Sequence, residues 1–169
     1  GLLAAPETGT GSPLRDRRIG LLGAGAAAGR VLAALLQRTP ASIRVANRPP
    51  AKAQDLARRH ADLGPVTGAG RDAISEAAPF DLLINATSQG HGGAAPDIAA
   101  SLFATDGLLY DMNYGAASRP LGEQCRQRGI TYSDGLGMLV AQAALSFHTW
   151  TGKEADTATV LEALRAAGE

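Results

Sequence analysis

Short apolar runs alternate along the chain with segments whose apolar residues recur every three or four positions. The apolar runs predict strands at residues 19–22, 43–46, 65–67, 80–84, 108–112 and 130–132. The periodic segments predict helices after residue 25 and over residues 51–60, 71–77 and 120–128. Because no two runs are joined by a hairpin turn, the alternation predicts an α/β fold, a doubly wound, mainly parallel sheet of about six strands with helices on both faces.

Two more helices are expected after the last of these strands. Residues 136–150 carry apolar side chains on more than one side of a helix, so we expect this helix to be covered on several sides. Gln142 is the polar residue that stands out within it. Asp156 is placed to cap the second helix, whose apolar residues also repeat at helical spacing.

Composition narrows the class of protein. The 169 residues are 45% hydrophobic, which suits one domain with a sizeable core. Lys and Arg number 16, as do Asp and Glu, so no net charge favours nucleic acid or an anionic membrane. No apolar run is long enough to cross a membrane, the single Cys125 excludes an intrachain disulfide, and the three histidines are scattered. We expect a cytoplasmic, metal-free protein that binds a small molecule.

A glycine-rich turn follows the first predicted strand and opens a helix. Gly23 permits a tight turn, Gly25 lacks the Cβ that would block a phosphate, and the small Ala28 lets the helix pack near the strand. Backbone N–H groups at a helix N-terminus attract an anion. The turn therefore predicts a dinucleotide site, with the pyrophosphate on Gly23, Ala24, Gly25, Ala26 and Ala27. The alternative is that the glycines only mark the change from strand to helix.

The second predicted strand ends in residues that favour NADP over NAD. NAD-binding domains carry an acidic residue there, which accepts hydrogen bonds from the ribose. This chain has Asn47 and Arg48 instead, with Lys52 one helical turn later. A guanidinium can pair with a 2′-phosphate, whereas a carboxylate would repel it. The alternative for Arg48 is a solvated residue in a turn.

Short polar residues follow three later strands, at the edge where open α/β sheets bind ligands. We expect these segments to outline one cleft with the glycine turn. The segments are Asn85-Ala86-Thr87-Ser88, Tyr110-Asp111-Met112-Asn113-Tyr114 and Ser133-Asp134-Gly135.

A complete catalytic apparatus is not recognisable in the sequence. Hydride transfer to a carbonyl also requires a proton donor. The two lysines are Lys52, in the expected phosphate site, and Lys153, near the end of the chain. His91 and Tyr114 are candidates, but His91 has no orienting carboxylate close in sequence. The sequence therefore predicts a cofactor half-site.

Taken together, these motifs occur in the order seen in shikimate dehydrogenases, and the chain resembles that family. The glycine turn is the least specific part of the likeness and residues 134–152 are the most specific. The resemblance implies NADPH-dependent reduction of 3-dehydroshikimate to shikimate, in the chorismate pathway to aromatic amino acids. It implies that Asn47, Arg48 and Lys52 hold the 2′-phosphate end of NADP(H). It also implies Met112 and Gly135 at the nicotinamide, with Tyr114 and Gln142 on the substrate.

The chain also departs from the family pattern. Pro49 replaces the usual Thr after Asn-Arg, which removes a hydroxyl and an N–H from the phosphate site, and Gly115-Ala116 replaces Asn-Pro. Family members carry an N-terminal substrate domain with a catalytic Lys and Asp, neither of which has a counterpart here. We therefore expect residues 1–16 to be a truncated inter-domain helix and loop, 17–152 the NADP-binding domain and 153–169 a C-terminal helix.

The resemblance leaves the assembly and the activity of the chain open. We expect no turnover by this chain alone, and either a monomer or a homodimer. A quinate/shikimate dehydrogenase relative and a non-catalytic NADP-binding module are the alternatives.

Overall fold

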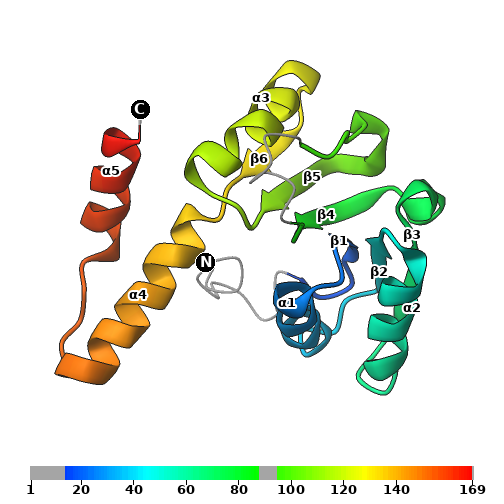
Figure 1. The fold of residues 1–169 in the computed structure, drawn as a ribbon, viewed down its shortest axis with the longest axis horizontal. Coiled ribbons are helices and arrows are strands. Elements are labelled where there is room, and N and C mark those ends of the chain that lie inside the picture. The colour runs from blue at the N-terminus through cyan, green and yellow to red at the C-terminus, as the bar shows by residue number, and fades with distance from the viewer. Residues whose placement is uncertain (1–13, 88–94, 169) are drawn as a thin grey trace.

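The fold is built on a parallel sheet with strand order β3-β2-β1-β4-β5-β6 (Figure 1). The computed structural model describes residues 14–87 and 95–168. The strands are β1 (Arg18–Leu22), β2 (Ser42–Asn47), β3 (Val66–Gly70), β4 (Phe80–Asn85), β5 (Phe103–Asp111) and β6 (Thr131–Ser133). The predicted Rossmann-like, doubly wound sheet of six parallel strands is confirmed.

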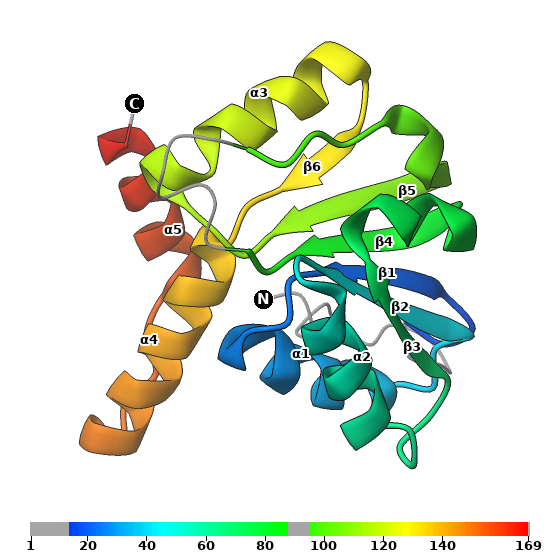
Figure 2. The same cartoon turned by 45° about the vertical axis from the view of Figure 1, so that its right-hand side comes forward.

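Helices cover both faces of the sheet (Figure 2). The α-helices are α1 (Ala26–Leu36), α2 (Pro50–Arg59), α3 (Arg119–Arg128), α4 (Leu136–Thr151) and α5 (Thr157–Ala167). Short 3-10 helices are η1 (Arg71–Ala77), η3 (Ala100–Leu102) and η4 (Gly115–Ala117).

Alternate residues of each strand feed two separate cores, because successive side chains of a strand point to opposite faces. Ile19 and Leu21 of β1 pack with α1 and α2 in one core. Leu22 packs in the other, with Leu121 and Cys125 of α3. Burial on both faces explains why the central strands are almost wholly apolar.

The strands β3 and β5 extend furthest beyond their predicted bounds. β3 continues to Gly70 instead of ending at residue 67, and a Cβ at Gly68 would collide with the backbone of Ala53 in α2. β5 begins at Phe103 instead of residue 108, and its pairing with β4 is irregular near Phe80. In both strands, a glycine lies where a Cβ would collide with neighbouring backbone.

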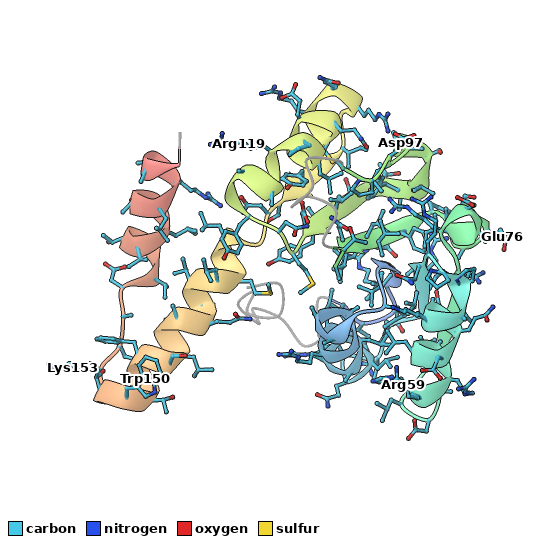
Figure 3. The ribbon with its side chains drawn as sticks, viewed as in Figure 1. Arg59, Glu76, Asp97, Arg119, Trp150 and Lys153 are labelled. Carbon is cyan, nitrogen blue, oxygen red and sulfur yellow. The ribbon has the colours of Figure 1, made fainter. Side chains whose placement is uncertain are left out.

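The last two helices extend away from the sheet (Figures 1 and 2). The expectation that α4 is covered on several sides is wrong for the described residues, where only Val140 of this helix is buried. Only the beginning of α4 approaches the sheet, and Trp150 at its far end is 82% exposed (Figure 3). The predicted cap of α5 is confirmed, since Asp156 accepts a hydrogen bond from the N–H of Thr159 over 3.1 Å.

Candidate functional site

The glycine turn lies where the strand order reverses between β1 and β4. Gly23 follows β1 directly and has a φ of 105°, which side chains rarely allow. Its N–H donates to the carbonyl of Ala46 in β2 over 2.8 Å. A Cβ at Gly23 would lie 2.9 Å from the carbonyl oxygen of Ala86, just after β4. Three strand ends therefore hold the turn, and the third leaves no room for a side chain.

Gly25, in contrast, faces open space. It is the N-cap of α1, and a Cβ built there would meet no protein atom within 4 Å. The first N–H groups of a helix have no acceptor within it, and they carry the positive end of the helix dipole. A cavity of about 420 Å³ lies beside them, lined by all of residues 23–27. We call it the glycine-turn cavity. The N–H donors beside it suit a pyrophosphate.

Three basic residues also line the glycine-turn cavity, and we call them the cation rim. They are Arg48, Lys52 and Arg71. Arg48 follows β2, Lys52 lies in the first turn of α2, and Arg71 follows β3. Arg48 and Lys52 are exposed, whereas Arg71 is half-buried. The sequence predicted the first two, and Arg71 was missed.

The β2–β3 register explains why Arg71 belongs to this rim. Asn47 pairs with Gly70 as the last pair of the parallel ladder. Arg48 and Arg71 are the next residues on the two strands, so their backbones leave the sheet side by side. Arg71 could be identified from the sequence only by knowing that β2 pairs with β3 and that β3 ends at Gly70. The sequence pattern ended this strand at residue 67, so Arg71 was not placed beside Arg48.

Asn47 and Pro49 shape the turn before α2. The side-chain amide of Asn47 donates to the carbonyl of Pro49 over 3.0 Å. Pro49 is the N-cap of this helix and offers no side-chain hydrogen bond to it. Asn47 lines the glycine-turn cavity, as predicted for a cofactor residue, and its amide N–H is engaged with its own loop.

A buried set of polar side chains joins the ends of β4 and β5, and we call it the strand-end network. The carboxylate of Asp111 accepts from the side-chain amide of Asn85 over 3.0 Å and from that of Asn113 over 2.8 Å. Asn85 in turn accepts from the hydroxyl of Thr87 over 2.7 Å. The hydroxyl of Tyr132 lies 3.2 Å from the other carboxylate oxygen. Asn85 is thereby directed into the network.

Burial dominates the electrostatics of this network. Asp111 is 1% exposed, and burial raises its pKa although its hydrogen-bond donors act in the opposite direction. Burial, followed by the negative charge of Asp111, raises the pKa of Tyr132 as well. Both shifts are toward the neutral forms of the two groups.

The structure brings together only part of the residues predicted for the nicotinamide side. Ala86 and Thr87 line the glycine-turn cavity, whereas Asn85, Met112 and Gly135 are absent from the lining formed by the described residues. Met112 packs against the core beside α1. A Cβ at Gly135 would collide with the carbonyl of Met112, so these two residues fix the approach of α4 to β5. Ser88 lies outside the described residues.

The two predicted substrate residues are on the surface. Tyr114 is 47% exposed and borders a second cavity, together with Leu136 of α4 and Leu164 of α5. Gln142 is exposed on α4. Neither residue lines the glycine-turn cavity within the described part of the chain. Their role in substrate binding stays a prediction.

Two kinds of feature are absent from residues 14–87 and 95–168. No group of three His, Cys, Asp or Glu side chains comes together in a way that could hold a metal ion. None of the helices there combines the length and the apolar character needed to cross a membrane.

The sheet order and the helices on both faces define a Rossmann-like α/β protein. The model of the shikimate / quinate 5-dehydrogenase family matches residues 5–92, which is more than half of the chain. The chain belongs to this family. A second model, the shikimate 5′-dehydrogenase C-terminal domain, matches residues 135–165.

Individual relatives agree with this assignment. A protein of Acidovorax ebreus named shikimate dehydrogenase (NADP(+)) is 43% identical over 170 residues, covering 99% of this chain and 60% of the relative. A structure of an Ael1 enzyme from Pseudomonas putida has a TM-score of 0.75 at 36% identity, covering 90% of this chain and 56% of the other.

Several similar structures were solved with a bound nucleotide. The shikimate 5-dehydrogenase of Thermus thermophilus, solved in complex with NADP(H) and shikimate, has a TM-score of 0.67 at 32% identity. The match covers 92% of this chain and 56% of that one. The chain thus spans about three fifths of the length of the curated relatives that it matches.

Proposed function

We propose that this chain is the NADP(H)-binding part of a shikimate dehydrogenase, which reduces 3-dehydroshikimate to shikimate with NADPH. The observation that carries the proposal is the glycine-turn cavity, which combines the N-terminus of α1 with the cation rim. A dinucleotide with an additional phosphate on its adenosine ribose needs both features within one hollow. Relatives named shikimate dehydrogenase (NADP(+)) support the choice of cofactor and reaction.

Each end of the cofactor has residues suited to it. Gly23 to Ala27 would hold the pyrophosphate, with the backbone N–H groups that begin α1 as donors, and the open space at Gly25 admits the phosphate oxygens. Asn47, Arg48 and Lys52 would hold the 2′-phosphate. Ala86, Thr87 and Ser88, with Asn85 behind them, would line the ribose and nicotinamide side, with Met112 and Gly135 at the nicotinamide.

The proposed domain division follows from these assignments. Residues 1–16 would be an inter-domain segment, residues 17–152 the NADP-binding domain and residues 153–169 the C-terminal helix.

The substrate side is proposed to involve Tyr114 and Gln142. When bound, NADPH supplies the hydride that reduces the ketone. The side-chain amide of Gln142 both donates and accepts hydrogen bonds, which suits a polyol, and Tyr114 adds a hydroxyl. Neither Lys52 nor Lys153 is suited to act as the general acid, because one belongs to the cation rim and the other is exposed beyond α4. We therefore expect this chain to bind the cofactor without turning over.

Calorimetric titration of the chain with NADP+ and separately with NAD+ tests the cofactor assignment. NADP+ should bind more tightly, and the Arg48→Gln variant should reduce that advantage. Equal affinities for both nucleotides, unchanged in the variant, would contradict the assignment to NADP.

A second assay tests the enzymatic part of the proposal. Shikimate and NADP+ added to this chain should give no increase in the absorbance of reduced nicotinamide. Robust formation of NADPH would show that the chain already contains the general acid. Kinetics on shikimate and on quinate, measured with the longest natural protein that contains this chain, would separate the two substrates. Binding of NADP+ without activity in that protein would favour a non-catalytic module.

A further inference from the structure

Arg71 occupies a position that links the cavity to the neighbouring surface. It lines the glycine-turn cavity together with Arg48 and Lys52. It also lines an adjacent hollow of about 420 Å³, again together with Arg48. Both arginines thus border the two hollows, beyond the last residue pair of β2 and β3.

The environment of Arg71 differs from that of the two exposed cations. Burial, followed by the positive charge of Arg48, lowers the pKa of Arg71, although Asp72 and Asp97 act in the opposite direction. Asp97 is 85% exposed and pairs with Arg128 over 2.7 Å, so its charge is divided and screened. Two cations held close together favour an anion between them.

Partial burial also makes Arg71 the better ordered ligand. Arg48 and Lys52 are exposed and lose rotamer freedom when they grip an anion. A half-buried guanidinium has already lost part of that freedom, and its charge acts through a lower effective dielectric. Per residue, Arg71 should therefore contribute more to the binding of an anion than its exposed neighbours.

The turn before α2 explains why such a residue is needed. Pro49 has neither an N–H nor a hydroxyl to donate, and the side-chain amide of Asn47 donates to its carbonyl. The cationic side chains that this turn and the start of α2 contribute to the cavity are those of Arg48 and Lys52.

We propose that Arg71, from the end of β3, is a specificity-determining residue that contacts the 2′-phosphate of NADP(H) and supplies the donor that Pro49 cannot. This inference rests on the proposed cofactor function. It places one contact to the 2′-phosphate at the junction of β3 and η1, outside the β2–α2 segment that carries Arg48 and Lys52.

Calorimetric titrations of NADP+ and NAD+ into the chain and its Arg71→Gln variant test the proposal. NADP+ affinity should fall about tenfold or more, as expected for one lost charge-assisted hydrogen bond, while NAD+ affinity stays within about twofold. The fragments 2′,5′-ADP and 5′-AMP should repeat this contrast. Arg71→Lys keeps the charge and should keep most of the preference for NADP+.

A matched control removes the same charge elsewhere. Arg59 ends α2, is exposed and pairs with Asp55 (Figure 3). Arg59→Gln should leave the affinities for both nucleotides unchanged. A comparable loss of NADP+ affinity in this control would show that the net charge of the protein, and not a contact from Arg71, explains the effect of Arg71→Gln. That result would overturn the proposal.

Two further outcomes separate the inference from the function on which it rests. If the unsubstituted chain prefers NADP+ and Arg71→Gln retains that preference, the role of Arg71 is overturned while the proposed function stands. If the unsubstituted chain binds neither nucleotide, the proposed function fails together with the inference. Should Arg71→Gln unfold in a thermal melt, a folded Arg71→Met variant decides. A fall in NADP+ affinity with unchanged binding of 5′-AMP in that variant supports the contact, and a retained preference for NADP+ overturns it.

Discussion

Asn85 at the end of β4 donates its side-chain amide to the carboxylate of Asp111 at the end of β5, over 3.0 Å. Both residues are 1% exposed. They are also partners in the register of the two strands, and the pair ends the ladder at the edge where the glycine-turn cavity opens. The Thr87 hydroxyl, which is bound by Asn85, belongs to a residue that lines this cavity. The strand-end network therefore fixes one wall of the candidate site.

Asp111→Asn should retain the stability of the parent protein to within about 1 kcal/mol, because an amide can replace the carboxylate in every contact. Its oxygen can accept from Asn85 and Asn113, and its nitrogen can donate to the hydroxyl of Tyr132. That hydroxyl also lies 3.2 Å from the carbonyl of Ser118 and can donate there instead. Urea unfolding at neutral pH measures the difference between the two proteins.

Asp111→Ala is the contrasting variant. It leaves the buried donors of Asn85 and Asn113 without their acceptor, and it should lower the free energy of unfolding by about 2–4 kcal/mol. Equal unfolding free energies for the Asn and Ala variants would show that the network does not depend on an acceptor at this position.

The raised pKa of Asp111 also predicts a pH dependence. Its pKa lies above the ordinary value of 3.8, so the folded protein holds a proton that the unfolded chain releases first. The stability contributed by this group is fully present below the unfolded-state pKa and is lost as pH rises through the folded-state pKa. The free energy of unfolding of Asp111→Asn, relative to that of the parent, should therefore increase with pH across this window and then level off.

Unfolding curves of both proteins from pH 4 to pH 8 would show this trend, about 1.4 kcal/mol for each unit of pKa difference. Asp55→Asn, at an exposed position of α2, serves as the control. A difference that is constant with pH would contradict the role assigned to Asp111.

Cys125 is expected to be chemically silent in the folded protein. Its side chain is fully buried, and burial raises its pKa to about 11. Because the thiolate is the reactive form, a disulfide reagent at pH 8 should modify the native protein only as fast as it opens. Adding denaturant should expose the thiol of Cys125, and the reagent should then modify it rapidly. Rapid modification without denaturant would mean that α3 detaches from the sheet readily.

The fold could be predicted from the sequence because its central strands are buried on both faces. Runs such as residues 80–84 are apolar throughout, and the periodic helices between them leave few alternatives to a parallel sheet. The strand boundaries were less predictable. Gly68 and Gly107 resemble turn residues, but they lie inside β3 and β5, where close approach to other backbone excludes a Cβ.

The candidate site was predictable as far as it is local in sequence. The glycine turn and Arg48 with Lys52 follow from spacing along one segment. Identifying Arg71 as part of the site requires the pairing of β2 with β3, which is not local in sequence. Asn85 was expected at the cofactor, but its side-chain amide donates to Asp111. Residues 88–94, with Ser88 and His91, lie outside the described structure.

Gly23→Ala should destabilise the fold. A φ of 105° is strained for alanine, and the new Cβ would lie 2.9 Å from the carbonyl oxygen of Ala86. We expect a loss of at least about 2 kcal/mol in the free energy of unfolding, measured by urea titration. Unchanged stability would indicate that the ends of β1 and β4 can separate without cost.

Gly25→Ala should separate binding from stability. Its φ of −83° suits alanine, and the added Cβ would meet no protein atom within 4 Å, so the free energy of unfolding should change by less than about 0.5 kcal/mol. The same methyl group would project into the space in which the pyrophosphate is expected, and it should weaken the binding of NADP+ and NAD+ alike, by about tenfold or more. Calorimetry on this variant, beside unfolding curves for Gly23→Ala, measures both quantities. Undiminished affinity for both nucleotides would place the phosphates elsewhere and remove the main support for a cofactor in the glycine-turn cavity.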